Sequence, residues 1–562
     1  MSYFKHGIFT LVFSILSTSI GYADSENLHY LEQNWSDKER NYFYFADQGS
    51  RLVTYDFFLN LEQADNENLF RSNSSMLRFG FIPAAPSANN PDGLPIGLTR
   101  NGDKMGMTCA ACHTQQITYK NQNIRIDGGQ AFIDLQLFLT QLTSSLKATM
   151  EHKQKFLRFQ QKLLGDQPTE KQQQALQQQL LAEYEKRRQY ATQNHTESVY
   201  GFTRLDAFGA ILNRALLATG VDNNSNPPNA PASYPYLWDT PQHDYVEWNG
   251  SQSNSGVGAL ARNIGEVIGV FSDIETETST WLGFIDGGYV SSINTSELRE
   301  LEHIVGKLYS PLWPDSFPEI DNDLVTVGRG LYEQYCIQCH LDIDRTDPMR
   351  KIQVRMSTLS EINTDPFMAE NAIYATGKTG KFEGRPRYYF AGNALAEQAP
   401  VIHIANNIMI GILKNNPLQS ILAKYDAKNL GHPDVNHPPK YVDGEIIEQG
   451  KEVSDHALLA YKARPLNGVW TSAPYLHNGS VPNMYQLLLP AEQRVKQFYL
   501  GSWEYDVKNL GYISQATDNS FLFDTTHVGN SNAGHEYGTG YYGNPALTEQ
   551  ERLALIEYLK IL

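Results

Sequence analysis

The stretches TCAACH (residues 108–113) and YCIQCH (residues 335–340) decide how this chain is built. In each stretch, two cysteines separated by two residues are followed directly by a histidine, and together the stretches use all four cysteines of the 562-residue chain. No cysteine remains for a structural disulfide. The fold must therefore be held together by its hydrophobic cores and by whatever the two motifs bind.

The spacing of the two motifs indicates what they bind. Two thiols three positions apart can each reach one vinyl group of a porphyrin, and the next histidine can then turn under the ring toward the iron. A zinc site would have to join both pairs and would leave the two histidines unexplained. A dithiol redox site more often carries proline between its cysteines, where this chain has Ala-Ala and Ile-Gln. We therefore predict two covalently bound haem c groups, attached through Cys109, Cys112, Cys336 and Cys339 and ligated by His113 and His340.

The charge balance excludes one class of partner. The chain carries 45 Lys and Arg against 62 Asp and Glu, and the resulting net charge of −17 repels phosphate. We therefore expect neither a nucleic-acid partner nor attraction to an anionic membrane. With 41% hydrophobic and 19% charged residues, the composition is that of a globular protein.

The N-terminus is typical of a secretory signal peptide. Lys5 and His6 precede an apolar run over residues 8–20, and Gly-Tyr-Ala at residues 21–23 forms a small-x-small cleavage site. The run is too short to span a bilayer as a retained anchor. Residues 1–23 are predicted to be removed, which leaves an exported protein, periplasmic or secreted, with no stable membrane insertion.

A proline-rich segment divides the chain. SPLWPDSFPEID (residues 310–321) interrupts the helical pattern with three prolines, so we place a domain boundary near Pro314. The predicted domains are an N-terminal haem domain over residues 24–313 and a C-terminal haem domain over residues 314–562. The first contains a Gln-rich helical arm over about residues 150–192, a helical-hairpin insertion that is either a solvated arm or a lid.

Helical periodicity dominates elsewhere, so the expected fold is mainly α: two cytochrome c-like haem domains with long irregular loops and few short strands. An amphipathic helix is expected to run into the second motif, and residues 548–562 are expected to form a docking helix. Two short alternating runs, residues 117–119 and 124–126, predict a hairpin after the first motif. Thr169 fits the capping position of the second helix of the arm.

Longer stretches carry a family resemblance. RPLNGVWTSAPYLHNGSVPNMYQLLLP (residues 464–490), combined with the two C-x-x-C-H motifs, resembles the di-haem cytochrome c peroxidase and MauG-like superfamily. Within it, the chain is similar to the oxygenase branch, which contains the di-haem rubber oxygenases and the bacterial di-haem fatty-acid dioxygenases. The Gln-rich arm matches no motif of that branch. The stretches similar to it are YFADQGSRLVTYDFFLNLE (44–62), GMTCAACHTQQITYKNQNIRIDGG (106–129), YLWDTPQHDYVEWNG (236–250), ALARNIGEVIGVF (259–271) and FDTTHVGNSNAGHEYG (523–538).

The resemblance implies different roles for the two haems. The N-terminal haem, ligated by His113, would be the active one and hold O₂ on an otherwise open distal face. The C-terminal haem would be six-coordinate, with His340 on one side and a histidine near the C-terminus, here His535, on the other. His477 would lie beside the haem and support it, while Met484 is the alternative ligand that peroxidase members suggest.

Four further residues are candidates for the site. Trp238, the candidate catalytic residue, could line the distal pocket or relay electrons between the haems, and a packed core tryptophan is the alternative. Trp248 is a weaker candidate for the same roles. Arg204 and Arg262 could hold haem propionates, because a guanidinium pairs with a carboxylate through two hydrogen bonds, whereas surface arginines are the alternative.

These features together predict a haem-dependent oxidoreductase. The resemblance implies a dioxygenase that inserts O₂ into an unsaturated hydrocarbon or fatty acid at the N-terminal haem. Two alternatives stay open, a di-haem peroxidase that reduces H₂O₂ and a cytochrome that only transfers electrons. The expected partners are O₂ and an apolar unsaturated substrate. Two further possibilities stay open, a small redox protein as a partner and a calcium ion as a cofactor.

Overall fold

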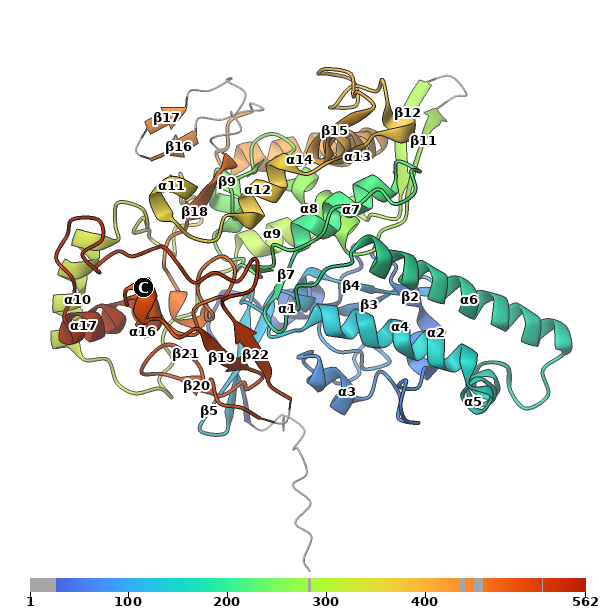
Figure 1. Ribbon diagram of the computed structural model, residues 1–562, viewed down its shortest axis with the longest axis horizontal. Coiled ribbons are helices and arrows are strands. Elements are labelled where there is room, and N and C mark those ends of the chain that lie inside the picture. The colour runs from blue at the N-terminus through green and yellow to red at the C-terminus, as the bar shows by residue number, and fades with distance from the viewer. Residues whose placement is uncertain (1–26, 282–284, 435–439, 444, 448–457, 518) are drawn as a thin grey trace, which may run out of the picture.

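A computed structural model describes most of the chain (Figure 1), over residues 27–281, 285–434, 440–443, 445–447, 458–517 and 519–562. The predicted signal peptide, residues 1–23, lies outside this description. Among the residues described, no helix is both long enough and apolar enough to cross a membrane.

Helices and many small sheets share the fold. About 38% of the chain is helical and 17% is strand, so the predicted mainly α class is corrected to a mixed α/β fold with small sheets. Most strands run over only two to four residues, too short for an alternating hydrophobic pattern to reveal them in the sequence. The fold therefore contains more strand than the sequence patterns predict.

The helices, labelled as in Figure 1, have the following bounds in the described chain: α1 (Asp37–Phe45), α2 (Tyr55–Asn60), α3 (Asn73–Arg78), α4 (Leu135–Glu151), α5 (Lys153–Leu164), α6 (Glu170–Gln193), α7 (Ala207–Leu217), α8 (Gly258–Gly269), α9 (Thr295–Gly306), α10 (Asn322–Tyr335), α11 (Leu359–Ile362), α12 (Phe367–Tyr374), α13 (Val401–Asn415), α14 (Pro417–Asn429), α16 (Met484–Leu487) and α17 (Glu549–Leu559).

The strands have these bounds: β1 (Leu28–Tyr30), β2 (Val53–Thr54), β3 (Leu98–Asn101), β4 (Lys104–Met107), β5 (Thr114–Tyr119), β6 (Gln122–Asp127), β7 (Arg204–Leu205), β8 (Ala232–Ser233), β9 (Tyr245–Val246), β10 (Gln252–Ser253), β11 (Ile274–Trp281), β12 (Ile285–Ser291), β13 (Arg355–Thr358), β14 (Thr376–Lys378), β15 (Gln398–Pro400), β16 (Lys440–Val442), β17 (Glu445–Ile447), β18 (Ala460–Ala463), β19 (Gln497–Leu500), β20 (Tyr505–Asp506), β21 (Gly511–Tyr512) and β22 (Phe521–Asp524).

The first motif lies between two small sheets. One sheet has the order β2-β4-β3 and the other β1-β6-β5, and a short 3₁₀ turn, Cys109–Ala111, lies between β4 and β5. The predicted hairpin is confirmed, since β5 pairs antiparallel with β6. Lys120 and Asn121 at its turn have φ of 48° and 65°, values typical of a two-residue type I′ turn. Strand pairing therefore fixes the chain on both sides of the motif.

The second motif follows directly from α10, as predicted. Cys336 is the C-cap residue of α10, and its N–H donates to the carbonyl of Tyr332. Helix α10 packs against α17, which confirms the predicted docking helix (Figure 1). The two helices lie so close that a Cβ on Gly328 would be 2.1 Å from the carbonyl oxygen of Ala554. The last helix of the chain thereby fixes the helix that carries the second motif.

Helices α4, α5 and α6 form the right-hand side of the molecule in Figure 1, where the arm was expected. Thr169 and Gln172 form the predicted capping box at the start of α6. Leu176, Leu180 and Arg187 are buried on one face of α6, and most of its glutamines are exposed. The Gln-rich arm is therefore a helical layer with one face packed on its neighbours.

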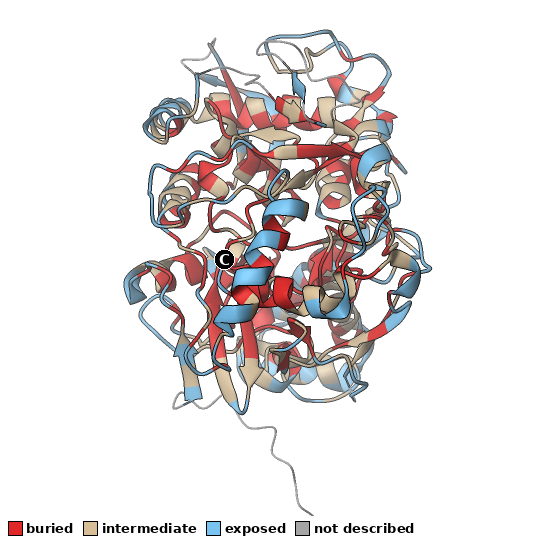
Figure 2. Cartoon of the chain, turned by 90° about the vertical axis from the view of Figure 1, so that its left-hand side faces the viewer, coloured by how far each residue is buried: buried red, intermediate tan, exposed pale blue. Residues whose placement is uncertain are grey.

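The largest hydrophobic core crosses the boundary predicted near Pro314. It contains Ile117 and Trp238 from the N-terminal side together with Trp470 and Leu555 from the C-terminal side. In Figure 2, the buried residues run through the interior, and the exposed ones lie on the outer helices and loops. The two predicted haem domains therefore share one hydrophobic core, and their boundary stays a prediction.

Candidate haem site

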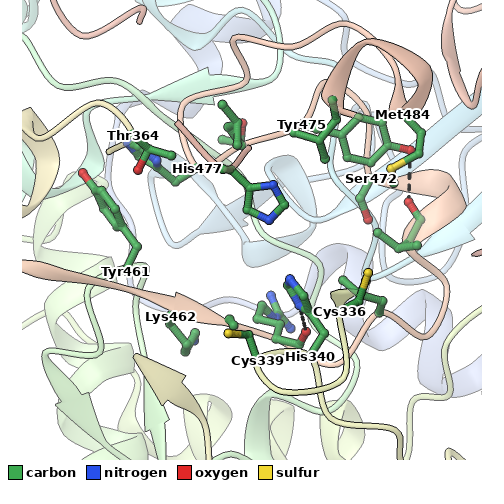
Figure 3. Close-up of a pocket in the computed structure, with 18 of the residues that line it drawn as sticks. Cys336, Cys339, His340, Thr364, Tyr461, Lys462, Ser472, Tyr475, His477 and Met484 are labelled. Atoms are coloured by element: carbon green, nitrogen blue, oxygen red, sulfur yellow. Dashed lines mark hydrogen bonds between the residues drawn. The ribbon is translucent and has the colours of Figure 1, made fainter. Parts of the chain in front are cut away.

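A cavity lies beside the second motif, between the end of α10, strand β18 and the C-terminal loops (Figure 3). It contains about 1370 Å³ of space that no protein atom fills, including the solvent at its mouth. Cys336, Cys339 and His340 line it together with His477 and His535. The fold therefore brings the complete second motif and both predicted C-terminal histidines to one cavity.

His340 and His535 lie at a separation that suits a metal ion between them. Their ring centroids are 6.2 Å apart, and the ring planes are inclined by 58°. An imidazole nitrogen bonds a metal at about 2 Å, so two imidazoles on opposite sides of one ion have ring centres about 6 Å apart. The residues present thus fit a six-coordinate haem iron, with Cys336 and Cys339 lining the same cavity for covalent attachment.

A backbone carbonyl orients the ring of each motif histidine. Nδ1 of His340 lies 2.6 Å from the carbonyl oxygen of Arg464, and Nδ1 of His113 lies 2.8 Å from that of Pro235. Because a carbonyl oxygen only accepts hydrogen bonds, Nδ1 carries the proton in both rings and Nε2 keeps its lone pair. Metal-bound histidines are oriented in this way. Both motif histidines are therefore prepared to bind iron through Nε2.

Burial sets the protonation of these groups. It lowers the pKa of His113 to about 4 and that of His535 to about 3, and the neutral imidazole is the form that binds metals. Burial also raises the pKa of Cys109 and Cys336 to about 12. No disulfide bond joins any of the four motif cysteines.

The loop that presents His535 is fixed by Arg494, which lies outside the stretches of sequence quoted for the family resemblance. The Arg494 side chain is buried, and its guanidinium donates to the carbonyls of Asn532 at 2.6 Å and Gly534 at 2.9 Å. It also donates to the carbonyl of His535 itself at 3.3 Å. The His535 N–H in turn donates to the carbonyl of Ile362 at 2.9 Å. A buried cation surrounded by carbonyls therefore holds the backbone of the candidate ligand.

His477 brings another imidazole to the same cavity. Its ring stacks on Tyr461 with centroids 3.9 Å apart, and Figure 3 shows it projecting into the cavity near His340. Its Nε2 is buried without a hydrogen-bond partner, and burial lowers its pKa to about 3. Met484 also lines the cavity. The prediction that His477 supports the haem stays a prediction. Because Nε2 of His477 has no hydrogen-bond partner, it is also able to bind a haem iron.

The two arginines predicted to hold propionates are engaged with protein groups. Arg204 is fully buried and donates to the carbonyl of Tyr200 at 2.7 Å and to the side chain of Asn530 at 2.8 Å. Arg262 forms an ion pair with Glu302 at 2.7 Å. The described residues that line the cavity include neither arginine. A propionate role for Arg204 and Arg262 stays a prediction.

Arg464 is the arginine that the fold brings to the cavity. Its guanidinium carbon lies 3.6 Å from the centre of the Tyr236 ring, and one of its terminal nitrogens donates to the carbonyl of Trp238. Its Nε is buried without a partner, so a donor remains for a haem carboxylate. The sequence contained a signal that could have identified Arg464 as a site residue, because Arg464 is the first residue of the longest stretch that carries the family resemblance.

Trp238 lies one ring behind the cavity wall. It is fully buried and stacks on Tyr236, which lines the cavity, with centroids 4.4 Å apart and planes inclined by 13°. Its Nε1 donates to the carbonyl of Asn467 at 2.9 Å. Trp248 lines the cavity itself. The packing is that of a core tryptophan, and a catalytic role for Trp238 stays a prediction.

An acidic pair lies near the first motif. Burial, together with the charge and hydrogen bonding of Glu247, raises the pKa of Glu266 on α8 to about 8. Burial is the largest cause that raises the thiol pKa of Cys109 and Cys112, and the charge of Glu266 is the second largest. A carboxyl group that keeps its proton at neutral pH therefore stands close to the predicted first haem. No motif marks Glu266 in the sequence.

The sequence left a calcium ion open as a further cofactor and assigned it no site. In the part of the chain that the structure describes, no three or more His, Cys, Asp or Glu side chains gather in a cluster able to hold a metal ion. Iron held by one or two histidines within a porphyrin needs no such cluster.

Known proteins resemble the chain both locally and along most of its length. A family of RoxA-like, cytochrome c-like domains matches residues 460–499, which include Arg464, His477 and Met484. The uncharacterised protein y4iJ of Sinorhizobium fredii (strain NBRC 101917 / NGR234) is 32% identical over 605 aligned residues, covering 96% of this chain and 94% of y4iJ. The chain belongs to the y4iJ family.

A more distant relative comes from the same organism. The uncharacterised protein y4iM is 23% identical over 321 residues, which cover 56% of this chain and 58% of y4iM. The RoxA-like segment implies haem c and indicates a haem-dependent oxidoreductase related to RoxA and the di-haem cytochromes. For this member of the y4iJ family, that match covers part of the cavity lining, including Arg464 and His477, whereas His340 and His535 lie outside it.

Proposed function

We propose that the protein is an exported di-haem c-type dioxygenase that inserts O₂ into an unsaturated hydrocarbon or fatty acid at the first motif. One asymmetry carries this proposal. Both motif histidines have Nδ1 anchored by a carbonyl, but a second imidazole stands 6.2 Å from His340, and no ring among the described residues pairs with His113 in this way. Paired histidines suit electron transfer, whereas a single histidine leaves one face of an iron free.

In this proposal, the first motif carries the haem that reacts with O₂, and the second motif carries the haem that transfers electrons. Bound haem supplies the iron-centred activation of O₂. His113 and His340 fix the orientation of the two macrocycles through their anchored Nδ1 atoms. The carbonyl of Pro235 accepts from His113, and the next residue is Tyr236. The ring of Tyr236 stacks on the guanidinium of Arg464. The carbonyl of Arg464 in turn accepts from His340. These neighbours hold the two motif histidines in a fixed relation to each other.

Export and substrate class form part of the proposal. The signal-peptide pattern of residues 1–23 supports a periplasmic or secreted location. O₂ and an apolar unsaturated chain are the proposed substrates, and a small redox protein is the proposed electron partner. The family resemblance supports both classes of substrate.

Isotope labelling tests the dioxygenase directly. Purified holoprotein is incubated under ¹⁸O₂ with an unsaturated fatty acid in one arm and with a polyisoprene in the other. We expect oxygenated product that carries the label in at least one arm, with loss of product in His113→Ala and retention in His527→Ala, a histidine exposed on the surface. Unlabelled product, or no product in either arm, would refute the proposal.

Mass spectrometry of the mature protein tests the number of haems. We expect two covalent haems on a chain that begins at Asp24. Alanine at both Cys336 and Cys339 should remove one haem, and alanine at both Cys109 and Cys112 should remove the other. A mature chain that carries fewer than two haems contradicts the di-haem assignment.

The acid near the first motif favours a second function, reduction of hydrogen peroxide. Cleavage of the peroxide bond needs a proton donor, and Glu266 holds a proton near neutral pH. Steady-state turnover with H₂O₂ and a reduced cytochrome donor tests this function. Glu266→Gln should lower that turnover by about 10²-fold, while Glu492→Gln at an exposed position should not. Labelled product that forms equally well in Glu266→Gln would favour the dioxygenase instead.

A further inference from the structure

A second cavity lies away from both motifs, where the arm joins the rest of the molecule. It contains about 650 Å³ of space free of protein atoms, with open solvent included. Helices α6 and α7, the segment after α8 and the start of β11 form its walls, and these elements meet near the centre of Figure 1. The lining residues that bear charge are Lys186, Arg187, Arg214, Asp273 and Glu275.

Two arginines in this cavity lack the partners that buried arginines need. Arg187 is 3% exposed, and its Nε and Nη1 have no hydrogen-bond partner. Arg214 donates through Nη2 to the carbonyl of Ser272 at 2.7 Å, but its Nε is also without a partner. A buried, unpaired cation is costly, so three unpartnered nitrogens on two adjacent guanidinium groups indicate a missing acceptor.

The nearby carboxylates do not supply that acceptor. Asp273 is paired with Lys186 at 2.8 Å and with Arg51 at 3.0 Å. Glu183, one turn before Arg187 on α6, accepts from Thr54 and pairs with Lys104. Glu183 Oε2 is itself buried without a hydrogen-bond partner, and the charge of Glu183 raises the pKa of Arg187, but no ion pair of the described residues joins the two.

The two guanidinium groups also repel each other. Burial and, to a smaller extent, the charge of Arg214 lower the pKa of Arg187 to about 10, against the charge of Glu183, which raises it. Burial lowers the pKa of Arg214 as well. An anion between the two groups would offset both effects, because an opposite charge favours the protonated guanidinium.

We propose that this cavity binds a compact oxyanion, a carboxylate or a phosphate, held by Arg187 and Arg214. A guanidinium offers donors in a planar fork that matches two oxygens of such a group, and two forks can hold one anion from two sides. Tyr190 and Phe271, whose rings pack 4.8 Å apart, form an apolar wall of the same cavity. The site is independent of the proposed haem chemistry and assigns a binding role to the Gln-rich arm.

The position of the site suggests what a bound anion would do. Phe271 and Asp273 directly follow α8, the helix that carries Glu266 near the first motif. Arg187 lies on α6 and Arg214 on α7. A bound anion would therefore tie the arm to α7 and to the end of α8.

Calorimetric titration of the purified holoprotein tests the site. Inorganic phosphate and acetate serve as separate arms at constant ionic strength, with sodium chloride as the reference salt. We expect saturable binding of at least one of the two anions by the wild type, and the arms show which oxyanion class is preferred. Arg187→Gln should weaken binding by about tenfold or more, because one fork is lost.

A matched control is available on the same helix. Arg188 is exposed and paired with Glu185, so Arg188→Gln should bind the anion as the wild type does. Far-UV circular dichroism verifies that each variant is folded, and Arg214→Gln replaces Arg187→Gln if the latter does not fold. Absence of saturable binding in the wild type, or equal binding by the wild type and a folded Arg187→Gln or Arg214→Gln, overturns the proposal.

Discussion

The guanidinium carbon of Arg464 lies 3.6 Å from the centre of the Tyr236 ring. This contact joins two backbone segments that each orient one motif histidine, since the carbonyl of Arg464 accepts from His340 and that of Pro235 accepts from His113. A substitution of Arg464 or Tyr236 can therefore alter the orientation of both motif histidines. Such a link suits the proposed di-haem protein, in which one haem would pass electrons to the other.

The first prediction concerns the sixth ligand of the second haem. His535→Ala in the holoprotein should convert one haem from low-spin to high-spin, because the imidazole 6.2 Å from His340 is removed. Visible absorption and electron paramagnetic resonance measure the change. His527→Ala, at an exposed position, should leave both spectra as they are. If His477→Ala changes the spin state and His535→Ala does not, His477 is the ligand.

The second prediction concerns the loop that carries His535. Arg494→Gln should lower the free energy of unfolding by about 3 kcal/mol, because several buried carbonyls lose their donor. It should also weaken the low-spin signal, although His535 itself is intact. Denaturant unfolding and absorption spectra measure these two effects. Arg329→Gln, an exposed change on α10, serves as the control, and equal losses in both variants would argue against the role of Arg494.

The third prediction concerns pH. The pKa of Glu266 is about 8 in the folded protein, against the ordinary 4.5 of the unfolded chain. Between these values the folded protein binds a proton that the unfolded chain has released, so the free energy of unfolding should fall as pH rises from about 4.5 to about 8. Glu266→Gln should flatten this slope, and Glu492→Gln should keep it. Urea unfolding across this pH window provides the measurement, and a slope unchanged in Glu266→Gln contradicts the assignment.

The fourth prediction separates two glycines on α10. Gly328→Ala should destabilise the protein by about 1–3 kcal/mol, because its Cβ would lie 2.1 Å from the Ala554 carbonyl oxygen. Gly330→Ala should stabilise it by up to about 1 kcal/mol, because no atom lies within 4 Å of its Cβ and alanine favours a helix. Denaturant unfolding of both variants measures the difference. Changes of the same sign would show that α17 does not pack on α10 this closely.

Local sequence patterns predicted the features that depend on neighbouring residues. The capping box at Thr169, the hairpin of β5 and β6, and the helix that leads into Cys336 are all confirmed, since each is encoded within a short segment. The motif spacing likewise indicated covalent haem, and the RoxA-like match implies haem c. Only a few short strands were predicted, and most of those found were not located, because two to four residues show no periodicity.

Features that depend on tertiary structure could not be predicted in this way. Nothing near Arg494 in the sequence shows that its side chain reaches the carbonyls beside His535, because the loop closes only in the folded chain. Arg464 acts on His340 through its backbone carbonyl, a group that every residue carries. The protonated state of Glu266 arises from burial beside Glu247, which a linear pattern does not record.

The core that crosses Pro314 has a consequence for how the chain reaches its native state. It joins residues from Leu31, directly after the first strand, to Leu559 in the final helix. Such long sequence separations slow folding, because much chain entropy is lost before distant contacts form. Neither half of the chain forms this core alone, so its packing is completed only when the last helix is in place.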